Sequence, residues 1–91
     1  MNSLETNANN QAFLEALKTF DVKAFKTYMK TWQRKSYKKY SKMNYIAQKS
    51  IMCQCIVDNK KLLDKDLVKK ANDYIKSVKK RAEEMDKNDH N

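Results

Sequence analysis

Residues 22–57 read VKAFKTYMKTWQRKSYKKYSKMNYIAQKSIMCQCIV, and this stretch decides how the chain folds. It contains nine basic residues and no Asp or Glu, so it carries a charge equal to the net +9 of the 91-residue chain. The rest of the chain contains eleven basic and eleven acidic residues, so its net charge is zero. Because aromatic residues lie between the lysines, the stretch indicates an anionic partner.

The composition predicts an all-α protein with one small domain. The chain contains no Gly and no Pro, on which tight turns and bulges depend, while its Lys, Leu, Ala, Glu and Met favour helix. A chain of this length buries only about 60–65 % of its unfolded surface, which leaves one modest core. We therefore expect a bundle of three to four helices over residues 10–86, with flexible segments at residues 1–9 and 87–91.

The first boundary within this bundle is predicted at Asp21. Asp is a preferred N-cap residue, and Phe20 and Phe25 stand at the two positions of a hydrophobic staple around it. A first helix of about ten residues, capped by Asn9 or Asn10, would end just before it. The second helix would carry an apolar stripe with a basic stripe beside it.

Residues 22–57 can form either one long helix or two shorter ones. The apolar stripe continues without a phase break, but an unbroken helix would be about 54 Å long, and five bases crowd from Arg34 to Lys42. We favour a break, with Ser41 as the new N-cap and Ser36 as the alternative. In an unbroken helix, much of the apolar stripe would need a second copy to cover it, which would make the protein a homodimer.

The later part of the chain supplies a core helix and a last amphipathic helix. The core helix follows the predicted break and ends at the turn-favouring residues 58–61, and Asp64 then caps the last helix. We expect the core to contain Phe13, Leu17, Phe25, Trp32, Ile46, Ala47, Ile51, Leu67, Ala71, Ile75 and Val78.

The residue patterns of catalysis and metal binding are missing. Cys53 and Cys55 lie two positions apart on a predicted helix and point about 200° apart, so we expect two reduced thiols. The only histidine, His90, lies in the C-terminal tail, and no Ser, His and acid set falls on neighbouring elements. We therefore predict no enzyme activity, no metal and no cofactor.

The hydropathy of the chain predicts a cytoplasmic protein. No run of 18 apolar residues occurs, and residues 1–5 have neither a basic start nor an apolar segment. Binding to a membrane surface through the second helix is disfavoured, because the core needs the apolar face of that helix.

The basic stretch is our candidate nucleic-acid site. Lysines neutralise phosphates and release counterions, and exposed aromatic rings stack on unpaired bases. Tyr37 and Tyr40 are the stacking candidates, because they lie in the least apolar part of the stretch. The predicted site consists of Lys23, Lys26, Lys30, Arg34, Lys35, Tyr37, Lys38, Lys39, Tyr40, Lys42 and Lys49.

A second reading is a protein-interaction module. In that case the basic face would dock on an acidic surface of a larger protein, as a small inhibitor or adaptor from a mobile element does. A helix-turn-helix DNA reader is less favoured, because its turn often uses Gly and the chain has none. We expect little base specificity.

Overall fold

All regular structure in the described part of the chain is helical. The computed structural model describes the backbone of residues 3–89 and the side chains of residues 10–85. In order, the elements are α1 (Ser3–Lys18), α2 (Val22–Trp32), α3 (Arg34–Tyr40), α4 (Tyr45–Asp58), a 3-10 turn η1 (Lys60–Leu62) and α5 (Lys65–Asp89). The predicted all-α class is confirmed, with five α-helices in these residues where three or four were expected.

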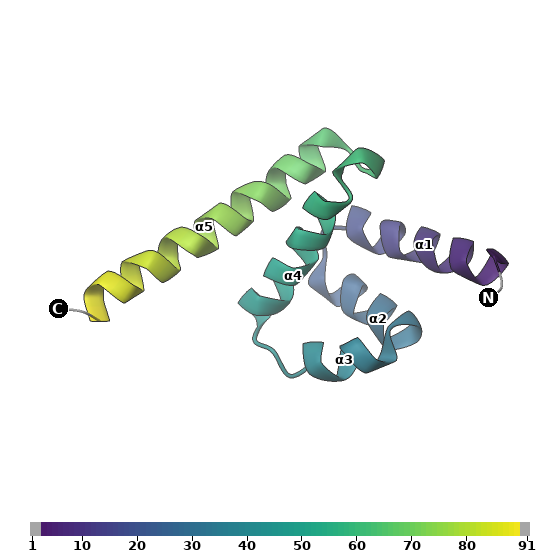
Figure 1. Cartoon of the computed structure of the whole chain (residues 1–91), viewed down its shortest axis with the longest axis horizontal. Helices are drawn as coiled ribbons and strands as arrows, with labels where there is room; N and C mark the ends of the chain where they lie inside the picture. Colours follow the sequence, from purple (N-terminus) through teal and green to yellow (C-terminus); the bar gives the residue numbers. More distant parts are fainter. Residues whose placement is uncertain (1–2, 90–91) are drawn as a thin grey trace.

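Helix α4 lies in the middle of the molecule. Helix α5 packs along one side of it, and α1 and α2 pack on the other, with α3 folded back beside α2 (Figure 1). The far end of α5 extends away from the other helices, so the molecule measures 55 × 30 × 21 Å (Figure 1). The helices that carry most of the basic residues, α2 and α3, therefore form one lobe beside the central helix.

Helix α1 begins at Ser3, earlier than the sequence suggested. Asn9 and Asn10 lie inside this helix and do not cap it, which corrects the predicted start. Helix α5 likewise continues to Asp89. The flexibility expected for residues 1–9 and 87–91 stays a prediction, and residues 1–2 and 90–91 lie outside the described residues.

The junction between α1 and α2 forms as predicted at Asp21. Its carboxylate oxygen Oδ1 accepts a hydrogen bond from the backbone N–H of Lys23 at 3.0 Å. Phe20, just before it, has a φ of 52°, a left-handed conformation that costs a residue with a Cβ about 1 kcal/mol or more. The Phe20 ring packs against the core, which offsets that cost in a way Gly would not.

The chain breaks twice within residues 22–57. Helix α2 ends at Trp32, and Gln33 separates it from α3. The second break ends at Asn44, whose side-chain oxygen Oδ1 accepts a hydrogen bond from the N–H of Ala47 at 2.8 Å and caps α4. The predicted break is confirmed, but both predicted caps are wrong, since Ser36 lies inside α3 and Ser41 follows its last residue. Because residues 22–57 do not form one unbroken helix, the argument for a homodimer no longer applies.

A buried pair, Tyr40 and Gln48, holds the α3–α4 turn closed. The Tyr40 hydroxyl donates to the Gln48 carbonyl at 2.7 Å, and Gln48 Nε2 donates to the carbonyls of Tyr40 and Met43, each at 3.0 Å. These bonds tie the last residue of α3 and the turn residue Met43 to α4, and they pair the buried hydroxyl and amide groups. The pair fixes the rotation of α4 and thus the face that enters the core.

That rotation explains one of two errors in the predicted core, and the end of α2 explains the other. The face of α4 that follows Gln48 contains Met52 and Ile56, so Ile46 points elsewhere and is 48 % exposed. Trp32, at the end of α2, is 43 % exposed. The buried apolar residues are Ala16, Leu17, Val22, Phe25, Tyr28, Met29, Tyr40, Met52, Cys53, Ile56, Leu63 and Ala71.

Most of the other predicted core residues contact this cluster. Leu17, Phe25 and Ala71 are buried in it, whereas Ala47 and Val78 are only half-buried. The partly buried residues that pack against it include Phe13, Ile51, Leu67 and Ile75. Both cysteines are free, with Cys53 buried and Cys55 half-buried, as the expectation of two reduced thiols required.

The buried tyrosine makes stability depend on alkaline pH. Burial, with the nearby Cys55 and Cys53 thiols as smaller causes, raises the pKa of Tyr40 from 10.0 to about 12. Its contribution to stability is therefore complete below pH 10 and is lost as the pH rises toward 12. Over this range, we expect the free energy of unfolding of wild type, measured with urea, to fall by up to about 3 kcal/mol more than that of Tyr40→Phe. Parallel pH curves for the two proteins would contradict the burial of this hydroxyl.

Candidate nucleic-acid interface

The bases of α2 occupy one side of an amphipathic helix. Val22, Phe25 and Met29 are buried, and the three lysines of α2 fall in a sector roughly 60° wide beside this apolar face, at about 100° per residue. Lys23 and Lys30 are exposed, and Lys26 is half-buried. The Asp21 cap and the packing of Phe25 thus fix which side of α2 turns its lysines to solvent.

Helix α3 adds a second set of bases next to the first. Arg34, Lys35, Lys38 and Lys39 are all exposed on this seven-residue helix, and Lys42 is exposed in the turn that follows. We call the basic residues of both helices and of this turn the α2–α3 basic segment. It consists of Lys23, Lys26, Lys30, Arg34, Lys35, Lys38, Lys39 and Lys42.

No carboxylate compensates this charge within the described side chains. The one ion pair found among residues 10–85 joins Lys18 Nζ to Glu15 Oε1 at 3.2 Å, outside the segment. No Asp or Glu occurs from residue 22 to residue 57, so the nearest acidic residue before the segment is Asp21, the N-cap of α2. The field of the segment is directed at solvent and attracts anions.

Tyr40 does not belong to the site, which corrects the prediction. Its ring is 2 % exposed and its hydroxyl is bonded to Gln48, so it has no free face for a base. Tyr37 is half-buried and packs against the core, which leaves part of its ring accessible. Its basic neighbours suggested that Tyr40 is exposed, but its hydrogen bonds with Gln48 in the turn before α4 keep it buried.

Lys49 lies apart from the other predicted bases. Its ammonium group sits 4.7 Å from the ring centroid of Tyr74, 5.2 Å from that of Phe20 and 6.0 Å from that of Tyr45. Such contacts stabilise by about 0.5–2 kcal/mol, more where the site is desolvated. Lys49 thus joins α4 to α5 and to the α1–α2 junction, and we place it outside the interface.

Trp32 is the candidate that the sequence reasoning missed. It is an exposed aromatic ring at the last position of α2, between Lys30 and Arg34 in the sequence. The apolar stripe assigned Trp32 to the core, because we continued the stripe beyond the residue at which α2 ends. The only sign in the sequence that the helix ends here was Gln33, a polar residue directly after Trp32.

The described residues hold no other recognisable site of chemistry. No group of three or more His, Cys, Asp or Glu among them could bind a metal ion. In this part of the chain, no helix is both long and apolar enough to cross a membrane. Comparisons with protein-family models, curated proteins and solved structures found no match to this chain.

Proposed function

We propose that this protein binds nucleic acid through the phosphate backbone, using the α2–α3 basic segment. The observation that carries the proposal is the uncompensated charge of this segment, eight bases without an ion pair among the described side chains. Helix α5 differs in sequence, because its lysines are interspersed with Asp and Glu, although its described side chains form no ion pair either. A long basic stretch that contains no acidic residue fits an anionic ligand better.

The expected binding is strong at low salt and nearly independent of sequence. Contacts between lysines and phosphates draw their free energy from released counterions and carry no base information. Seven of the eight bases are Lys, a compact charge that lacks the bidentate fork with which Arg reads guanine. The protein would act as a non-enzymatic binder, and its cytoplasmic location stays a prediction.

Trp32 and Tyr37 give the proposed site a preference for single strands. Both residues lie between basic residues of the segment in the sequence, and both rings are at least partly accessible. Stacking on an unpaired nucleobase contributes about 1–3 kcal/mol. Duplex DNA keeps its nucleobases paired, so it would contact the basic side chains but not stack on the two rings. We therefore expect single-stranded oligonucleotides to bind more tightly than duplexes of equal charge.

The single tryptophan provides the test. Trp32 is the only Trp of the chain, so its fluorescence reports on the proposed site alone. Titration with single-stranded oligonucleotides should quench this fluorescence, and a duplex should quench it less. The variant Trp32→Phe keeps a ring, whereas Trp32→Ala should weaken single-strand binding by about 1 kcal/mol or more and leave duplex binding unchanged.

The competing function is docking on an acidic protein, by the same basic segment. Binding of oligonucleotides no tighter than millimolar at low salt would defeat our proposal and favour that reading. Retention of one specific protein partner, with an on-rate that falls as salt rises, would then be expected.

A further inference from the structure

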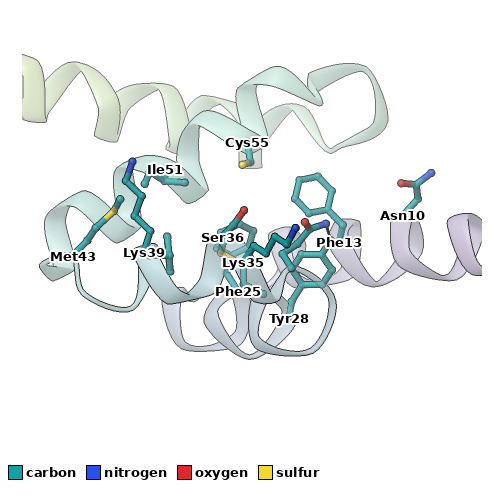
Figure 2. A pocket seen from close by; sticks show the side chains of 13 residues that line it. Asn10, Phe13, Phe25, Tyr28, Lys35, Ser36, Lys39, Met43, Ile51 and Cys55 are labelled. Atoms are coloured by element: carbon teal, nitrogen blue, oxygen red, sulfur yellow. Dashed lines mark hydrogen bonds between the residues drawn. The ribbon is translucent and has the colours of Figure 1, made fainter.

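A pocket of about 720 Å³ opens beside α3, within the size range that holds small-molecule ligands. Its walls come from four helices, α1, α2, α3 and α4, and from the turns that follow α2 and α3 (Figure 2). Figure 2 shows the sulfur of Cys55 pointing from α4 toward α3, where Ser36 faces it. The pocket is thus a hollow between α3 and the rest of the bundle.

The lining is mostly apolar and contains no acidic residue. Phe13, Met29, Met43 and Ile51 supply flexible aliphatic groups and one ring, and Lys35 and Lys39 border the pocket from α3 (Figure 2). Neither lysine has an ion-pair partner among the described side chains. The pocket therefore offers an apolar interior next to two uncompensated positive charges.

The aromatic rings of the pocket are already engaged with one another. Phe13 packs on Phe25 and Tyr28 with centroid distances of 6.2 and 5.5 Å, and Phe25 packs on Tyr40 at 5.7 Å. Phe25, Tyr28 and Tyr40 are buried, so little of their faces remains open for a planar base. A flexible aliphatic chain fits the irregular space beside methionines better than a nucleobase does.

From this combination we propose that the pocket binds a small anionic amphiphile, a single aliphatic chain with a carboxylate head of the fatty-acid type. The chain occupies the apolar interior, and the carboxylate lies at the edge of α3 that bears Lys35 and Lys39. This proposal is independent of nucleic-acid binding, because it depends on the pocket interior. The two functions share only these two lysines.

Cys55 gives a local readout of occupancy. It lines the pocket and is half-buried, whereas Cys53 is fully buried and acts as an internal reference. Dodecanoate below its micelle concentration should bind with one-to-one stoichiometry in calorimetry and slow the alkylation of Cys55 by iodoacetamide. Affinity should rise by up to about four-fold for each CH₂ from octanoate to dodecanoate.

Three probes and three variants make the test specific. Dodecanol and dodecylammonium lack the anionic head, and each should protect Cys55 at least about ten-fold less well than dodecanoate does. Dodecanoate should likewise protect Cys55 at least about ten-fold less well in Lys35→Gln/Lys39→Gln than in wild type. Ser36→Phe places a ring at the pocket wall from an exposed position and should abolish protection. Lys79→Gln/Lys80→Gln removes the same charge from the extended part of α5 and should change nothing (Figure 1).

Other results would overturn the proposal. Equal protection by dodecylammonium, or several molecules bound per chain, would indicate an unspecific apolar surface. Protection by mononucleotides but not by dodecanoate would make the pocket a base-binding site. Faster alkylation with dodecanoate would mean that the amphiphile unfolds the protein. If Ser36→Phe loses its helical circular dichroism, a bulky reagent on Cys55 replaces it as the blocking change, and undiminished dodecanoate binding after that modification contradicts the proposal.

Discussion

Replacing Ile56 by Ala should destabilise the protein by about 2–5 kcal/mol, because it removes buried methyl groups and leaves a cavity. Ile56 is fully buried on the side of α4 that faces the core. A domain of this size has about 5–15 kcal/mol of stability in total, so the loss is a large fraction of it. Thermal unfolding followed by circular dichroism should show a midpoint lower by roughly 10 °C or more.

The matched control is Ile46→Ala on the same helix. Ile46 is 48 % exposed, so the same chemical change should cost less than about 0.5 kcal/mol, and the better helix propensity of Ala offsets part of that cost. Equal losses at the two positions would mean that α4 is rotated from the orientation set by Tyr40 and Gln48. The comparison therefore tests the core and the turn together.

Reversing three charges of the α2–α3 basic segment should nearly abolish nucleic-acid binding. The variant Lys30→Glu/Arg34→Glu/Lys38→Glu removes three phosphate contacts and adds three repulsive charges, none of them at a pocket-lining position. At about 50 mM salt, we expect an affinity loss of at least about 100-fold, since each contact releases nearly one counterion. Fluorescence anisotropy of labelled oligonucleotides measures it.

The control for this prediction carries the same change of charge on α5. Lys76→Glu/Lys79→Glu/Lys80→Glu alters three exposed lysines of a helix that also bears acidic residues. If binding depends only on the net charge of +9, both triple variants lose affinity equally. A loss confined to the α2–α3 variant locates the interface.

Local signals in the sequence were enough to predict the all-α class and the starts of two helices. Asp21 and Asp64 stand directly before α2 and α5, as their side chains predict for N-cap residues. Leu17, Phe25 and Ala71 are buried, because each lies on the apolar stripe of its helix. These features depend on residues within a few positions of each other.

What could not be predicted depends on contacts between helices. Asn44 was passed over as a cap, because the Tyr40–Gln48 hydrogen bonds that favour the second break form only when the turn closes. The same bonds bury a tyrosine that its basic neighbours suggested was exposed. Trp32 became a surface residue because α2 ends beside it, and the pocket arises from the space that two short helices leave.

The most direct test of the central claim is the salt dependence of duplex binding by wild type. If about six bases of the segment contact phosphates, log Kd plotted against log salt concentration should rise with a slope near 5. Neutralising Lys30, Arg34 and Lys38 with Gln should lower that slope by about 3, and the same change at Lys76, Lys79 and Lys80 should leave it near 5. A wild-type slope below about 2, or an equal decrease in both triple variants, would contradict the account.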